Sequence, residues 1–131
     1  MSSEFDAFDC SAQINDGVKL DLTLPDGSPS GQWIKVRNFR SDAYREALAA
    51  LQAKRAEKGR PDAAEAKADR LNLLATLISE WSFKTPLTKE NAVAFLGKAM
   101  LVPEQIDRLC VDDSRFFGNG STDSTNGPKP K

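Results

Sequence analysis

Apolar and polar residues alternate without interruption over residues 18–24, which read Val-Lys-Leu-Asp-Leu-Thr-Leu. A period of two is typical of a strand with one buried face. A segment rich in proline and glycine follows, and both residues favour turns. Ile34 and Val36 then share one face of a second strand-like segment. The sequence therefore predicts a β-hairpin over residues 18–37, which must pack on other elements because a lone hairpin is marginal in water.

A helical pattern begins after this hairpin. Ser41 is a good N-cap residue, and the apolar side chains that follow recur at helical spacing. Gly59 suits the end of one helix and Pro61 the first turn of the next. Residues 52–70 contain no large apolar side chain. We therefore predict an αα-hairpin whose tip projects into solvent.

The strongest apolar stripe comes later and predicts the centre of the core. It consists of Leu71, Leu74, Leu77, Ile78 and Trp81. This spacing is compatible with one broad helical face, so the second helix is expected to continue through this stripe. Further helix starts are predicted at Thr88, a favourable N-cap, and at Pro103, which suits a first turn. The predicted helices span about residues 41–58, 62–82, 88–98 and 103–115.

The ends of the chain differ from its centre. Residues 1–16 carry acidic side chains and no lysine or arginine, which predicts an acidic flexible arm. Residues 118–131 contain no large apolar side chain and predict a disordered polar tail. Residues 17–117 are expected to form a single domain. The expected fold class is mainly α: a small domain of about four helices with an N-terminal β-hairpin as a minor component and disordered termini.

Composition argues against several functional classes. The chain has 131 residues, a net charge of −1, no histidine and two cysteines far apart. Without histidine a Ser-His-Asp triad is impossible, and two isolated thiols argue against a zinc site. No stretch resembles a signal peptide or a membrane span. We therefore expect no enzymatic activity, no cofactor or metal, no membrane or nucleic-acid partner, and a cytoplasmic location.

Positive charge is nevertheless concentrated in one region. Residues 35–60 contain eight basic and three acidic residues. A nucleic-acid interface, a solvated or internally paired face, and a contact for an acidic protein remain open as interpretations; the absence of interleaved aromatic residues argues against nucleic acid. Arg37, Arg40 and Arg45 are the candidate partner-binding residues of this region.

Three aromatic residues are further candidates for partner contact. Phe83 follows a predicted helix end, and Phe116 and Phe117 precede the polar tail. Aromatic residues at such positions can form an exposed patch that a partner covers. Burial in the core is the alternative for each of the three.

Several short segments also occur in a characteristic order. They are Gly31-Gln32-Trp33-Ile34-Lys35-Val36, Ser41-Asp42-Ala43-Tyr44-Arg45, Leu77-Ile78-Ser79-Glu80-Trp81, Pro86-Leu87-Thr88-Lys89-Glu90-Asn91-Ala92, Gln105-Ile106-Asp107 and Asp113-Ser114-Arg115-Phe116-Phe117. This order resembles the tail assembly chaperone family of long-tailed bacteriophages and prophages. The resemblance covers about residues 15–117 and depends on order and spacing more than on any single motif.

The resemblance implies a non-catalytic factor of the host cytoplasm that is absent from the mature virion. Its implied partners are the tape measure protein, which it would keep soluble, and the major tail tube protein, which it would recruit; self-association is a further option. A structural tail-completion or head–tail connector protein is the alternative, and a small nucleic-acid-binding regulator is a third. Many family members also have a longer form made by programmed frameshift, and Gly127-Pro128-Lys129 could be encoded by a slippery heptamer. An ordinary polar terminus is the alternative there.

Overall fold

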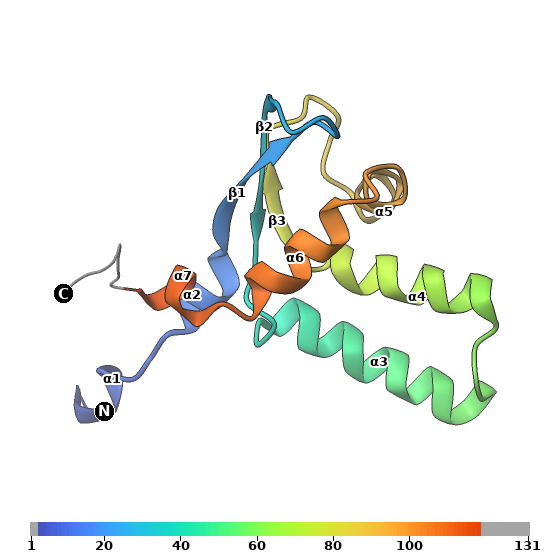
Figure 1. Ribbon diagram of the computed structural model, residues 1–131. Helices are drawn as coiled ribbons and strands as arrows, with labels where there is room; N and C mark the ends of the chain where they lie inside the picture. The colour runs from blue at the N-terminus through green and yellow to red at the C-terminus, as the bar shows by residue number, and fades with distance from the viewer. Residues whose placement is uncertain (1–2, 119–131) are drawn as a thin grey trace.

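The computed structural model describes residues 3–118 of the chain (Figure 1). The elements in chain order are α1 (Ser3–Asp6), α2 (Ser11–Asp16), β1 (Val18–Thr23), β2 (Pro29–Val36), α3 (Asp42–Lys58), α4 (Ala63–Ala75), β3 (Ile78–Trp81), α5 (Lys89–Lys98), α6 (Val102–Cys110) and α7 (Asp113–Phe117). The predicted tail and the possible slippery site lie outside the described residues, apart from Gly118.

The fold is mixed α+β, with a larger β component than the sequence predicted. The predicted hairpin is confirmed, because β1 and β2 pair antiparallel with Val18 opposite Val36 and Leu20 opposite Ile34. A third strand, β3, pairs antiparallel with β2 on its other side, giving the strand order β1-β2-β3. The hairpin is therefore part of a three-stranded sheet, so the expected class of a mainly α domain needs this correction.

The prediction of one helix over residues 62–82 is wrong at its C-terminal end. Helix α4 ends at Ala75, and the next residues form β3. Val36 lies opposite Ile78 and Ile34 opposite Trp81 across the sheet. Ile78 and Trp81 fit a strand as well as a helix, and continuing the helix would leave the second edge of β2 unpaired. Tertiary pairing therefore overrides the local helical period.

The predicted helix over residues 103–115 is also divided. Helix α6 ends at Cys110 and α7 begins at Asp113. The carboxylate of Asp112 accepts a hydrogen bond from the Ser114 hydroxyl at 2.6 Å. Aspartate side chains that bond locally in this way favour a turn over a continuous helix.

The αα-hairpin of α3 and α4 projects from the body as predicted (Figure 1). Its turn carries strong local signals: Gly59 ends α3 with φ of 84°, and Asp62 and Glu65 form a capping box at the start of α4. Asp69 joins the two helices through an ion pair with Arg55 at 2.9 Å. No residue of α3 is fully buried, which agrees with a hairpin that is largely solvated.

One face of the sheet packs against the ends of α4, α5 and α6. The largest fully buried apolar side chains are Ile34, Val36, Leu77, Leu96 and Ile106. Helix α6 crosses the sheet in Figure 1, and it contributes Ile106 to this core. Burying such residues supplies the main favourable free energy of folding.

The N-terminal segment is only partly a loose arm. Residues 11–16 form α2, whose Ile14 carbonyl accepts from the Asn38 amide at 3.1 Å and whose Asn15 side chain accepts from the Asp42 amide at 3.0 Å. The prediction of a flexible arm is therefore wrong for this part. Helix α1 stands apart from the body, beyond α2 (Figure 1).

Within residues 3–118, no helix is both long and apolar enough to span a bilayer.

Candidate functional site

An apolar groove lies between the tip of the β1–β2 hairpin and the connection from α5 to α6. Its volume is about 510 Å³. It is lined by Leu22, Thr23, Leu24, Pro25, Ser30, Gln32, Phe83, Phe95, Lys98, Ala99, Met100, Leu101 and Val102. We call this feature the hairpin groove.

One wall of the hairpin groove is a short turn with exposed apolar side chains. Helix α5 ends at Lys98 and α6 begins at Val102. The amide of Val102 donates a hydrogen bond to the Ala99 carbonyl at 2.9 Å, which closes the turn between the two helices. Met100 and Leu101 lie in this turn, and their side chains are 78% and 59% exposed, respectively. Exposing two large apolar side chains side by side is unfavourable in water, so this turn is a candidate contact surface.

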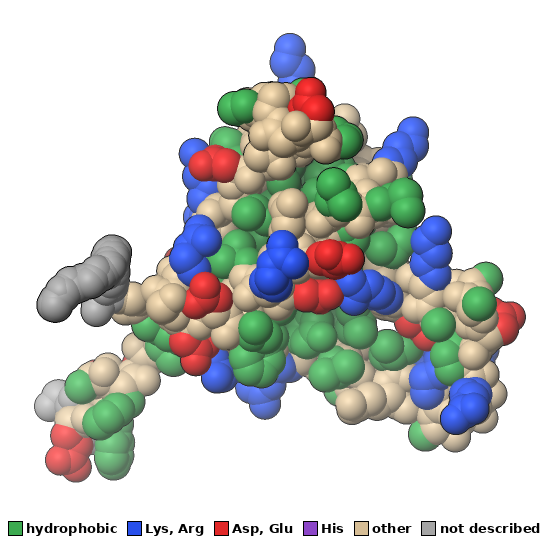
Figure 2. All heavy atoms as spheres, in the orientation of Figure 1, with side chains coloured by type: hydrophobic (Ala, Val, Ile, Leu, Met, Phe, Trp, Pro, Cys, Tyr) green, Lys and Arg blue, Asp and Glu red, His purple; other side chains and the backbone are tan. Residues whose placement is uncertain are grey.

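The opposite wall comes from the hairpin. Leu22 points into the core and is buried, whereas Leu24, just beyond the end of β1, is 49% exposed. The amide of Leu24 donates to the Ser28 carbonyl at 2.8 Å, which fixes the tight turn. Figure 2 shows hydrophobic side chains on the part of the surface below the hairpin tip. A hydrogen-bonded turn and a helix end therefore face each other across apolar space.

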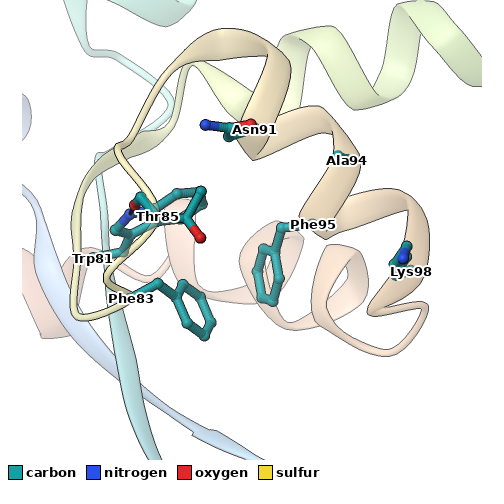
Figure 3. Close-up of a pocket in the computed structure, with 7 residues that line it drawn as sticks. All are labelled: Trp81, Phe83, Thr85, Asn91, Ala94, Phe95 and Lys98. Atoms are coloured by element: carbon teal, nitrogen blue, oxygen red, sulfur yellow. Dashed lines mark hydrogen bonds between the residues drawn. The ribbon is translucent and has the colours of Figure 1, made fainter.

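A cluster of aromatic residues extends this groove into a second, smaller pocket of about 270 Å³ (Figure 3). The Phe83 ring lies 5.2 Å from the Trp81 ring and 5.1 Å from the Phe95 ring. The indole Nε1–H of Trp81 donates to the Thr85 carbonyl at 2.8 Å, which satisfies its polar atom. Phe83 and Phe95 line both cavities, so the aromatic cluster and the hairpin groove form one continuous apolar surface.

The charge of this surface has one sign. Lys98 lines both cavities, and among residues 3–118 no acidic residue lines either of them. Figure 3 places Lys98 on α5, at the end of the helix beyond Phe95. A ligand that combines apolar side chains with a nearby carboxylate is therefore complementary to this site.

The structure places Phe83 in the groove but puts the other two candidate phenylalanines elsewhere. Phe116 is buried, at 7% exposure, which agrees with the alternative that it belongs to the core. Phe117 is 42% exposed. Both belong to α7, which contacts α2 at the opposite end of β1 from the hairpin tip. The three phenylalanines therefore do not form one patch.

The three candidate arginines have different surroundings. Arg37 donates from Nε to the Asn15 carbonyl at 3.0 Å and from a terminal nitrogen to the Thr76 carbonyl at 2.7 Å, so it ties α2 and the end of α4 to the sheet. Arg40 pairs with Asp113 at 2.8 Å. Arg45 lies exposed in the first turns of α3.

The basic region is in part internally paired. Lys35 pairs with Glu80 at 3.8 Å, and Lys54 pairs with Asp69 at 3.6 Å. The Arg40 guanidinium holds the pKa of the Asp113 carboxyl below its usual value through a hydrogen bond, and the pKa of Arg40 is raised by the same contact. These pairs favour the interpretation of a solvated, internally compensated face.

The adjacent acids Asp112 and Asp113 do not form a proton-sharing pair. Asp113 is held ionised by Arg40, whereas a carboxyl that acts as a general acid needs a raised pKa. Cys110 is buried, and burial raises the pKa of its thiol, so this side chain acts as a small apolar residue. Among residues 3–118, no three histidine, cysteine or acidic side chains lie together as metal ligands would.

Sequence reasoning missed Leu24, Met100 and Leu101 as functional candidates. One signal was present: residues 99–102 read Ala-Met-Leu-Val in the linker between two predicted helices, where polar residues are more usual. Met100 and Leu101 line the same groove as Leu24, which lies some 75 residues earlier in the chain, and local pattern could not predict that proximity.

Comparisons with protein-family models, with curated proteins and with solved structures found no match for this chain. The geometry of the hairpin groove and the order of the sequence segments are therefore the basis for a proposal of function.

Proposed function

We propose that this protein is a tail assembly chaperone of a long-tailed bacteriophage, which binds apolar faces of the helical tape measure protein and keeps it soluble until tail tube subunits replace it. The observation that carries the proposal is the hairpin groove, with Leu24, Met100 and Leu101 exposed around it. The order of sequence segments described above supports the same assignment.

The groove suits an amphipathic helix as its ligand. Helices dock through apolar side chains spaced three and four residues apart, and an apolar groove between two walls accepts such a row. The groove has a volume of about 510 Å³, and most of its lining residues are apolar. Lys98 can pair with a carboxylate on the flank of that helix. This combination selects an apolar, acid-flanked helix over a nucleic acid.

The expected affinity of the groove for a helix of the tape measure protein is low enough for the complex to be transient. Fully burying one large apolar side chain contributes about 1.5–3 kcal/mol. Association costs about 4–15 kcal/mol in lost translational and rotational freedom, and ordering of side chains adds to this cost. A few side chains in one groove therefore give reversible binding, which polymerising tube subunits can displace.

Co-expression with the tape measure protein of the same phage tests the proposal. The wild-type chain should raise the soluble fraction of the tape measure protein and co-purify with it. Met100→Glu combined with Leu101→Glu should abolish both effects, because two carboxylates would lie in the apolar groove. Val111→Glu is the matched control, since Val111 is also apolar and 56% exposed but does not line the groove.

Two results would count against the proposal. One is a groove variant that still solubilises the tape measure protein as well as the wild type does. The other is a fixed copy number of this chain in purified particles, measured by mass spectrometry, which would favour the structural tail-completion or connector protein.

A further inference from the structure

Residues 3–10, which precede α2 and are called the N-terminal arm below, carry two large apolar side chains that are exposed to solvent. Phe5 and Phe8 are 70% and 84% exposed. They lie three residues apart, and the Phe8 amide bonds to the Phe5 carbonyl at 3.0 Å, so one helical turn displays both on the same side. Figure 2 shows hydrophobic side chains on this arm, at the lower left, well away from the body. Such exposure is unusual for a domain with a well-packed core and indicates a contact made with another surface.

The arm and the hairpin groove are complementary. Residues 1–16 contain acidic side chains and no basic ones, with Asp6 and Asp9 close to the two phenylalanines. The groove is apolar, and its charged lining residue is Lys98. Two aromatic rings flanked by carboxylates therefore match the polarity and charge of the groove.

The arm of the same molecule does not reach this groove. The end of α2 is held at the start of β1, where the Asp16 carbonyl accepts from the Ser79 hydroxyl at 2.7 Å. The groove lies at the far end of β1, about 17 Å away for a strand of this length. With its helical turn intact, the segment from Phe5 to Cys10 spans at most about 15 Å. It also leaves α2 on the side away from the hairpin tip (Figure 1).

We propose that the arm of one molecule, with Phe5 and Phe8 as anchors, occupies the hairpin groove of a second copy. The contact joins two different surfaces, so it gives a reciprocal exchange between two copies, a larger closed ring, or an open chain. The inference goes beyond the proposed function and does not depend on it. The contact is small and reversible, so it leaves the groove accessible to a ligand that binds more tightly.

Sedimentation velocity on the purified chain tests this proposal without any other protein. The mass of the wild type should rise between low and high micromolar concentration. Phe5→Ser with Phe8→Ser should weaken self-association at least about tenfold, because the two anchors are lost. Ala7→Ser is the matched control on the same arm and should behave as the wild type. Since Phe5, Ala7 and Phe8 are exposed, the variants should keep the circular dichroism spectrum of the folded chain.

A mixing experiment distinguishes the arm–groove contact from other modes of association. The arm variant retains an intact groove, and Met100→Glu with Leu101→Glu retains an intact arm. Each alone should self-associate at least about tenfold more weakly than the wild type, and an equal mixture should form a one-to-one complex. A wild type that stays monomeric at high concentration would overturn the proposal, as would self-association that survives the arm substitutions or a mixture that stays monomeric.

Discussion

Arg37 offers the sharpest test of how this fold is held together. Its guanidinium donates to the carbonyls of Asn15 and Thr76, at 3.0 Å and 2.7 Å, from a partly buried position. Thr76 follows the last residue of α4, where carbonyl groups lack helical partners and the negative end of the helix dipole favours a cation. One side chain therefore joins the N-terminal segment, β2 and α4.

The expected cost of Arg37→Ala follows from these contacts. A hydrogen bond that involves a charged group contributes about 1.5–3 kcal/mol, and the partial exposure of Arg37 places the value at the low end. We expect the substitution to lower the free energy of unfolding by about 2–4 kcal/mol. For a domain of this size the melting temperature should fall by about 4 °C per kcal/mol.

Urea unfolding followed by circular dichroism measures this change. Arg45→Ala is the matched control, because Arg45 is exposed in the first turns of α3, and it should change stability by less than about 0.5 kcal/mol. Arg37→Lys should give an intermediate loss, because an ammonium cannot reproduce the two separate donors of the guanidinium fork. If Arg37→Ala were as stable as the control but lost binding to a partner, its assignment as a structural tie would be refuted and a contact role supported.

Three further predictions concern the core, an ion pair and the cysteines. Ile106→Ala should lower the free energy of unfolding by about 2–5 kcal/mol, because Ile106 of α6 is fully buried in the hydrophobic core; a loss below about 1 kcal/mol would mean that the core can collapse around the cavity. The pKa of Asp113 is lowered in the folded chain by Arg40, so the stability from this pair is present above the unfolded pKa of aspartate and is lost as the pH falls through the folded value. Asp113→Asn should therefore reduce the acid sensitivity of unfolding midpoints measured across that pH range, and an unchanged pH profile would contradict this. Burial raises the pKa of Cys110, whereas Cys10 is only half-buried, so a thiol reagent at pH 8 should modify Cys10 much faster; equal rates for the two thiols would contradict the structure.

Local signals predicted several elements correctly. The β1–β2 hairpin follows from strict alternation and a turn rich in proline and glycine. Thr88 caps α5 as predicted, with its hydroxyl accepting from the Asn91 amide at 3.1 Å. Such features depend on residues close together in the chain, so the sequence pattern carries them directly.

The third strand shows where local pattern is insufficient. Leu77, Ile78 and Trp81 fit one face of a helix, and Ile78 and Trp81 also fit pairing positions of a strand. The choice depends on β2, which lies about 45 residues earlier and offers an unpaired edge. Because the free energy of that pairing is tertiary, the sequence of the segment alone favoured the wrong element.

What the sequence by itself determined about this protein is therefore the local framework: the hairpin, the starts of α3, α4, α5 and α6, the projecting αα-hairpin and the absence of a histidine-based catalytic site. The tertiary structure alone decided the candidate site. Leu24 and Met100 face the same groove only because α5 and α6 pack against the sheet at the hairpin tip. Packing between distant elements sets which apolar side chains are buried and which remain exposed, and exposure is the property that defines a contact surface.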